Sequence, residues 1–153
     1  MALHLRRGSA AAVAVEKGLT VTPRAIGPLL PMLSRAQVRG DTTAGAATVG
    51  ELCQGGQGFE VSDSAGRPVM AYVLAIRDHA AARVCWVQAA GGAMPGVDLT
   101  RELMPTIERQ AQEQGAWQVA ITTRRRGLIK KLRAQGYQIS GVTLRKEING
   151  LAT

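Results

Sequence analysis

The run Pro68–Arg77 (PVMAYVLAIR) restricts the fold of this chain more than any other feature of its sequence. It is nearly continuously apolar, and residues that favour turns bound it on both sides. Such a run predicts a central strand buried on both faces. No apolar run in the chain reaches the roughly 18 residues that a membrane-spanning helix needs. A membrane-spanning protein is therefore excluded.

Two shorter stretches flank this run and extend it into a sheet. Phe59–Ser62 is expected to form a strand, and the residues 63–66 (DSAG) form a hairpin turn before the central strand. Arg83–Ala90 (RVCWVQAA) follows as a further strand. Three consecutive strands with short connections predict an antiparallel meander.

The segment before the meander is expected to contain an arm and broken helices. We interpret residues 1–19 as an irregular or extended arm, and residues 20–153 as one domain. Thr22 and Pro23 have the order of an N-cap followed by a first helical residue, which predicts helical turns to about Gln37. Residues 48–51 (TVGE) have the spacing of a capping box and predict a short helix through Cys53.

The segment after the meander alternates helices and strands. A glycine-rich loop, 91–96, precedes Asp98, the expected N-cap of a helix that ends near Gly115. A strand at 116–122 leads to a second helix at 124–135, for which Gly136 is the expected stop. Residues 137–146 are expected to form a last strand with a bulge at Gly141. The fold class is therefore α/β (α+β), a mixed and mostly antiparallel sheet flanked by helices.

The charge distribution points to an anionic partner. The chain has a formal net charge of +8, and residues 101–153 hold ten basic and four acidic side chains. No acid lies between Glu113 and Glu147. Such a block is typical of contact with a phosphorylated cofactor, nucleic acid or an acidic protein surface, although a solvated helix face explains it equally well. The block lacks interleaved aromatic residues, which argues against stacking on single-stranded nucleic acid.

Few residues have the chemistry of a metal centre or a disulfide framework. Two cysteines, Cys53 and Cys85, and two histidines, His4 and His79, form neither a four-ligand zinc pattern nor a disulfide scaffold. We therefore expect no metal. We interpret the N-terminal residues as an arm and not as an export signal, so a cytoplasmic origin is expected by default, and two unpaired cysteines fit a reducing compartment.

The stretch from Asp98 to Lys146 resembles the GNAT superfamily of acetyl-CoA-dependent N-acetyltransferases. The run LIKKLRAQGY, residues 128–137, is similar to the family's helix that ends in glycine and an aromatic residue, and the order of elements matches over roughly 20–146. The resemblance implies a GNAT fold with acetyl-CoA as cofactor. QAAGGA, residues 88–93, is a literal match to the pyrophosphate loop, but it lies several residues early, before an inserted MPGV. The cofactor-binding residues that follow are Gln88, Gly91, Gly92, Ala93 and Gly96 for the pyrophosphate, and Arg124, Arg125, Arg126 or Lys130 for the 3′-phosphate.

The family's catalytic groups are harder to find in this chain. Leu132 occupies the position at which many members carry a tyrosine that acts as general acid, and Tyr137 takes the place of a packing phenylalanine. The strands at 68–77 and 83–90 contain no carboxylate that could act as a base.

These departures favour a GNAT-like protein that has lost catalysis. Such a chain resembles degenerate GNAT-like proteins of tailed bacteriophages, and would serve in virion assembly with protein neighbours or as a homo-oligomer. The alternative is an active N-acetyltransferase acting on an unidentified amine. Nucleic-acid binding alone is a third possibility, with a steep salt dependence as its signature.

Overall fold

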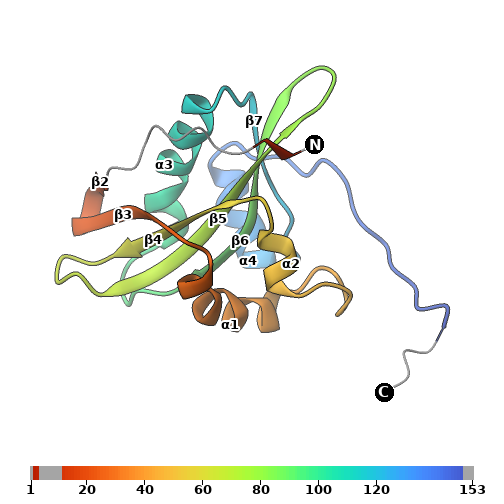
Figure 1. Ribbon diagram of the computed structural model, residues 1–153, viewed down its shortest axis with the longest axis horizontal. Coiled ribbons are helices and arrows are strands. Elements are labelled where there is room, and N and C mark those ends of the chain that lie inside the picture. Colours follow the sequence, from red (N-terminus) through yellow and green to blue (C-terminus); the bar gives the residue numbers. More distant parts are fainter. Residues whose placement is uncertain (1, 4–11, 150–153) are drawn as a thin grey trace.

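The computed structural model describes residues 2–3 and 12–149, which fold around one seven-stranded sheet (Figure 1). The strand order is β2-β3-β4-β5-β6-β7, and β1 pairs with the end of β5. β6 and β7 are parallel, and all other pairs are antiparallel. The strands are β1 (Ala2–Leu3), β2 (Val13–Val15), β3 (Leu19–Arg24), β4 (Gln57–Ser62), β5 (Pro68–Asp78), β6 (Arg83–Gly92) and β7 (Gln118–Ile121).

Helices cover both faces of this sheet. One face packs against the 3₁₀ turn η2 and helices α1 and α2, and the other face packs against α3 and α4. The helical elements are η1 (Glu16–Gly18), η2 (Gly27–Leu29), α1 (Leu30–Gly40), α2 (Val49–Cys53), α3 (Leu99–Glu113) and α4 (Arg126–Ala134). In the described part of the chain, no helix is long and apolar enough to cross a membrane.

The central strand predicted from the apolar run is confirmed as β5. Every residue from 71 to 76 is buried, and alternate side chains enter two separate cores. Tyr72, Leu74 and Ile76 face α3 and α4, whereas Ala71 and Val73 face α1 and α2. Because helices pack on both faces of the sheet, neither face of this strand is polar.

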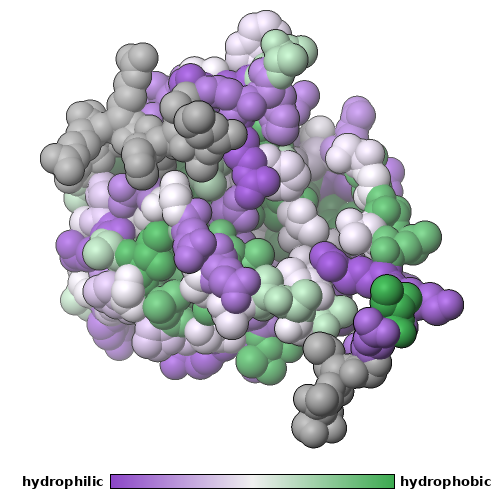
Figure 2. Space-filling model, turned by 45° about the vertical axis from the view of Figure 1, so that its right-hand side comes forward, coloured by the Kyte–Doolittle hydropathy of each residue, from purple (hydrophilic) through white to green (hydrophobic). Residues whose placement is uncertain are grey.

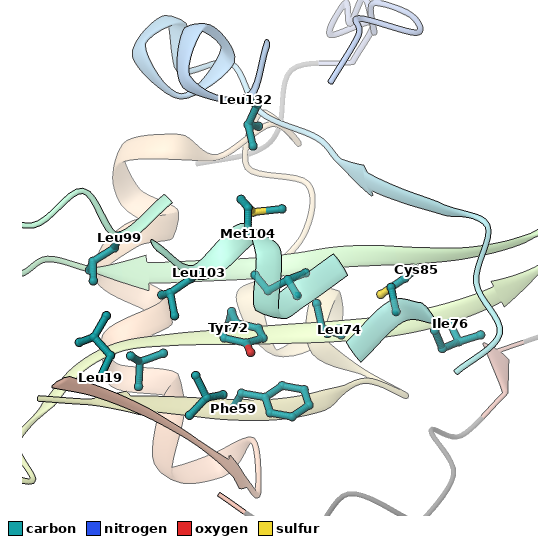
Figure 3. Packing of buried hydrophobic residues seen from close by; sticks show 14 residues of the cluster. Leu19, Phe59, Tyr72, Leu74, Ile76, Cys85, Leu99, Leu103, Met104 and Leu132 are labelled. Atoms are coloured by element: carbon teal, nitrogen blue, oxygen red, sulfur yellow. The ribbon is translucent and has the colours of Figure 1, made fainter. Parts of the chain in front are cut away.

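The core between the sheet and α3 is the larger of the two (Figure 3). Leu103 and Met104 of α3 and Leu132 of α4 point toward Tyr72. The Tyr72 ring stacks on Phe59 with a centroid distance of 5.0 Å, and its hydroxyl donates to Gln110 Oε1 at 2.7 Å. This hydrogen bond satisfies the one polar atom that Tyr72 takes into the core.

Local signals predicted several element boundaries correctly. Thr48 caps α2 by accepting a hydrogen bond from the Glu51 N–H at 3.2 Å, and Asp98 caps α3 by accepting from the Arg101 N–H at the same distance. The hairpin turn before β5 is also confirmed, with the Asp63 carboxylate accepting from two backbone N–H groups of the turn. At such positions the side chain itself supplies the bond that fixes the backbone.

The helix start predicted at Thr22 and Pro23 is wrong, because both residues lie in β3. Leu19 and Val21 alternate with Thr20 and Thr22, and this period of two places the apolar pair in the core. Pro23 fits in a strand because β2 pairs with β3 only as far as Val21. The missing N–H of the proline therefore costs no bond to β2.

The last strand predicted at 137–146, with a bulge at Gly141, is also wrong. Residues 138–149 form no strand and run away from the body of the molecule (Figure 1). Of the expected arm at 1–19, residues 1 and 4–11 lie outside the described residues, and Val13–Val15 pairs with β3 as β2. The division into an arm and one domain stays a prediction.

Candidate functional site

The two parallel strands separate at their carboxyl ends. β6 and β7 pair at four positions, from Val84 with Gln118 to Val87 with Ile121. β6 then continues to Gly92, whereas β7 ends at Ile121. The connections to α3 and to α4 therefore leave from the same edge of the sheet. Crevices at the carboxyl ends of parallel strands, where helices begin, are common places for phosphate-bearing ligands.

Two glycines that were expected in a loop lie inside β6. Gly91 pairs with Ala71 of β5, and Gly92 pairs with Met70. A Cβ at Gly91 would lie 2.6 Å from the Ala36 Cβ of α1, so this glycine lets the helix approach the strand. Gly92 has φ +141°, and a Cβ there would lie 2.2 Å from the Val69 carbonyl oxygen. The loop boundary predicted at residue 91 is therefore wrong, since packing against α1 and β5 requires both glycines.

The connection between β6 and α3 is short and bends back on itself. It contains Ala93 and Gly96, whereas Gln88 lies in β6. The Ala93 N–H donates to the Val69 carbonyl at 3.0 Å, and the Val97 N–H donates to the Met94 carbonyl at 3.1 Å. These two amides are engaged within the protein and are therefore not available to a phosphate.

A carboxylate already occupies the N-terminus of α3. Asp98 accepts from the Arg101 N–H, and Lys131 Nζ of α4 lies 3.4 Å from the same Asp98 oxygen. Burial acts to raise the pKa of Asp98, but the backbone hydrogen bonds and Lys131 outweigh it and hold the pKa below its usual value. An ionised Asp98 repels a second anion at this helix end. The contact with Lys131 places the start of α3 beside the last turn of α4.

The start of α4 has the opposite character. Arg125 is its N-cap residue and makes no side-chain capping bond, so the positive end of the helix is not neutralised by its own cap. Arg124, Arg125 and Arg126 are all exposed, and Lys130 is exposed one turn later. The Arg124 guanidinium donates to the Arg39 carbonyl at 3.3 Å, which places the start of α4 beside the end of α1. This cluster suits an anion better than the start of α3 does.

The side chains that could act as an acid, a base or a nucleophile near this site are mostly buried or already hydrogen-bonded. Leu132 is 5% exposed and belongs to the core. The position at which the resemblance implies a tyrosine therefore has no proton donor in this chain. The Tyr137 hydroxyl donates to Glu108 Oε2 at 3.1 Å, and burial raises the tyrosine's pKa. Burial raises the pKa of Cys85 to about 12, so its thiol is no nucleophile.

Sequence reasoning missed one carboxylate, Glu60 on β4. The register places Glu60 opposite Ala71 of β5, and Ala71 opposite Gly91 of β6, so the three residues form one row on the α1 face of the sheet. The Glu60 side chain is 21% exposed, and its Oε1 lies 3.7 Å from Arg24 Nε. Paired residues share a face of the sheet, so the Glu60 carboxylate lies on the same face as a side chain at Gly91 would. Two strand spacings, about 10 Å, separate these two positions. The expected strand began at Phe59, but only sheet register connects Glu60 with β6.

The arrangement of the sheet and helices is the GNAT acetyltransferase fold. Its defining features here are the antiparallel strands up to β6, the parallel pair of β6 and β7, and the helices that follow those two strands. No protein-family model matches the sequence. A search of curated proteins also finds no relative.

This chain superposes on nearly the whole length of several solved structures that have this fold. A Pyrococcus furiosus protein assigned as an acetyltransferase superposes with a TM-score of 0.64 at 12% identity, covering 85% of this chain and 99% of its own. Glucosamine-6-phosphate N-acetyltransferase from Arabidopsis thaliana gives 0.58 at 8% identity, covering 86% and 99%. The aminoglycoside 6′-N-acetyltransferase of Acinetobacter baumannii gives 0.55 at 13% identity, again covering 86% and 99%. At these identities the likeness is one of fold.

Proposed function

We propose that this chain is an acyl-CoA-dependent N-acyltransferase with acetyl-CoA as its donor. The observation that carries the proposal is the separation of β6 from β7 beside the basic, uncapped start of α4. A ligand that combines a thioester arm with several phosphates suits a gap between strands next to a cluster of arginines. The solved acetyltransferases of the same fold support this proposal. They give no support to a loss of catalysis or to a place in a phage particle.

The phosphates would lie toward α4 rather than on α3. Asp98 already caps α3 with a negative charge, whereas Arg124 and Arg125 present exposed guanidinium groups at the start of α4. Lys130 follows one turn later on the same helix. Gln88, Gly91 and Gly92 at the end of β6, with Ala93 and Gly96 in the connection that follows, would then line the path of the pantetheine arm. Backbone N–H groups of β6 beyond Val87 would hold the thioester carbonyl, because no strand pairs with them on that side among residues 12–149.

The reaction needs a neutral amine and a group that accepts its proton. The amine nitrogen attacks the thioester carbonyl, a C–N bond forms, the C–S bond breaks, and CoA leaves as a thiolate. Glu60, directly or through water, would take the proton from the amine. Because Leu132 cannot donate a proton, the thiolate would take its proton from solvent. Holding the two reactants in line would then supply most of the acceleration.

A binding titration tests the donor site. Calorimetry with acetyl-CoA is expected to give saturable binding, and Arg124→Ala/Arg125→Ala should raise Kd at least about tenfold, since charge-assisted hydrogen bonds contribute about 1.5–3 kcal/mol each. Arg109→Ala/Arg133→Ala removes the same charge from exposed positions elsewhere and serves as the matched control. If Arg124 and Arg125 contact the 3′-phosphate, dephospho-CoA, which lacks that phosphate, should bind the two double variants with equal Kd. The absence of acetyl-CoA binding to the unaltered protein would refute the proposal.

A turnover assay tests the chemistry separately. Thiol release from acetyl-CoA is followed with a panel of primary amines, and Glu60→Gln should lower kcat/KM while leaving the Kd for acetyl-CoA unchanged. Glu60→Gln also removes an ion pair that is partly exposed, which costs little stability. Equal rates for Glu60→Gln and the unaltered protein across the pH range would remove Glu60 from the mechanism.

A further inference from the structure

A cleft lies between helix α3 and the turn that connects β2 with β3 (Figure 1). Its volume is about 510 Å³, which falls within the roughly 300–1,000 Å³ of small-molecule sites. Val15 of β2 packs on the same core as Leu103 of α3, so the two walls of the cleft are joined by that core. The cleft shares no residue with the proposed donor site or with Glu60.

The cleft gathers charged side chains of both signs. Hydrophilic residues are spread among hydrophobic ones over the surface, as the face in Figure 2 shows. The cleft differs because its charged side chains surround one hollow, and among the described residues none of them forms an ion pair. Charges that the chain itself leaves unpaired are free to pair with those of a ligand. These side chains are Glu16, Lys17, Arg101, Glu102 and Arg109.

Thr106 adds a hydroxyl that the protein leaves unpaired. The residue is 3% exposed and lines the cleft, and the described residues offer its hydroxyl no hydrogen-bond partner. Buried polar groups nearly always have a partner. An unpaired hydroxyl beside a cleft therefore marks a place where a water molecule or a ligand binds.

Pro105 removes a helical hydrogen bond on the same face of α3. Proline has no N–H, so the Arg101 carbonyl lacks its regular partner four residues later. A helical carbonyl points toward the residue four positions on, and Pro105 lines the cleft. The Arg101 carbonyl therefore lies on the side of α3 that faces the cleft, where it can accept from an ammonium group.

Lys17 lies on the wall opposite α3 in a strained conformation. Its φ is +64°, and Gly18 follows with φ +71°. Glycine adopts such values freely, whereas a lysine rarely does. Backbone strain of this kind is concentrated at binding and active sites, where the surrounding structure holds a side chain in place. Here it places an ammonium group at the cleft.

We propose that this cleft binds an acidic α-amino acid, either free or as the first residue of a short peptide. Such a ligand carries two carboxylates and one ammonium group, which complement the cations and carboxylates of the cleft. Arg101 and Arg109 lie about 12 Å apart along α3, and their long side chains can reach one carboxylate each from the two ends. Glu102 and the Arg101 carbonyl accept from the ammonium group, and the Thr106 hydroxyl donates to a carboxylate. The inference does not depend on the proposed acyltransferase activity.

Calorimetric titration with L-glutamate tests the ligand class. Saturable binding is expected. Glutarate, which lacks the ammonium group, and L-glutamine, which lacks one carboxylate, should each bind at least about tenfold more weakly. Titration with L-glutamyl-glycyl-glycine distinguishes the two sources, because the tighter ligand shows whether a peptide or a free amino acid is preferred. No saturable binding of either, or glutarate binding as tight as that of L-glutamate, overturns the proposal.

Two variants separate binding from folding. Thr106→Val exchanges the unpaired hydroxyl for a methyl group, and Lys17→Gly removes the ammonium group while it relieves the backbone strain. Each should raise the Kd for L-glutamate at least about fivefold without lowering the midpoint of thermal unfolding. Arg133→Ala, at an exposed position of α4, is the control and should leave that Kd unchanged.

The two readouts give opposite results if the residues serve only the fold. A lower unfolding midpoint in Thr106→Val would show that its hydroxyl is bonded within the protein, which overturns its role in the site. Equal Kd values for L-glutamate in Thr106→Val, Lys17→Gly and the unaltered protein would overturn the assignment of the ligand to this cleft.

Discussion

Replacing Gly91 by alanine tests why a glycine stands at this position in β6. The new Cβ would lie 2.6 Å from Ala36 Cβ and 3.0 Å from the Met32 carbonyl oxygen, both on α1. Neither atom belongs to a flexible side-chain end, so the helix or the strand has to shift. Overpacking of this kind costs about 1–3 kcal/mol, and we expect Gly91→Ala to lower the free energy of unfolding by about 2 kcal/mol.

A double-mutant cycle isolates the contact itself. Ala36→Gly removes the nearer of the two atoms, and alone it should cost about 1 kcal/mol because glycine is a poor helix former. If the contact limits the approach of α1 to β6, the double variant should lose about 1 kcal/mol less than the two single losses together. Urea unfolding of the four proteins gives these values. Strictly additive losses would refute the packing role of Gly91.

The same variants separate packing from phosphate binding. Gly96→Ala is the matched substitution in the β6–α3 connection, where no atom lies within 4 Å of the new Cβ and only the φ of +75° opposes it. It should cost about 1 kcal/mol of backbone strain and show no coupling to Ala36→Gly. A Kd for acetyl-CoA that is unchanged in Gly91→Ala would assign this glycine to the packing of α1 alone.

Three further predictions concern the core and the start of α3. Tyr72→Phe should destabilise the protein by about 1–2 kcal/mol in urea unfolding, since the Gln110 side chain loses the hydroxyl at 2.7 Å. Leu132→Ala should cost about 2–5 kcal/mol because a buried side chain leaves a cavity, whereas Leu132→Met should cost less than about 1.5 kcal/mol. Asp98 has a lowered pKa in the folded state, so its contribution to stability is complete above the unfolded pKa and is lost as the pH falls through the folded value. Asp98→Asn should therefore reduce the free energy of unfolding at neutral pH and make its decrease below about pH 4 less steep. Urea unfolding at a series of pH values measures both effects. A decrease as steep as in the unaltered protein would show that Asp98 does not contribute to the pH dependence of stability.

Features fixed by neighbouring residues were predictable from the sequence. The caps at Thr48 and Asp98 and the turn at Asp63 are local hydrogen bonds, and each was predicted at its correct position. The buried run at 68–77 also identified the central strand, because a layer on each side leaves no polar face. Together these signals were enough to order the elements and to suggest the GNAT fold.

Features decided by distant residues were not predictable in the same way. Pro23 reads locally as a helix start, but its place in β3 depends on pairing with Phe59. Gly91 reads as a loop residue, but it is a strand residue because α1 needs its missing side chain. Glu60 became a candidate only through the register that aligns it with Gly91 across β5. Each of these depends on tertiary contacts that a single sequence does not display.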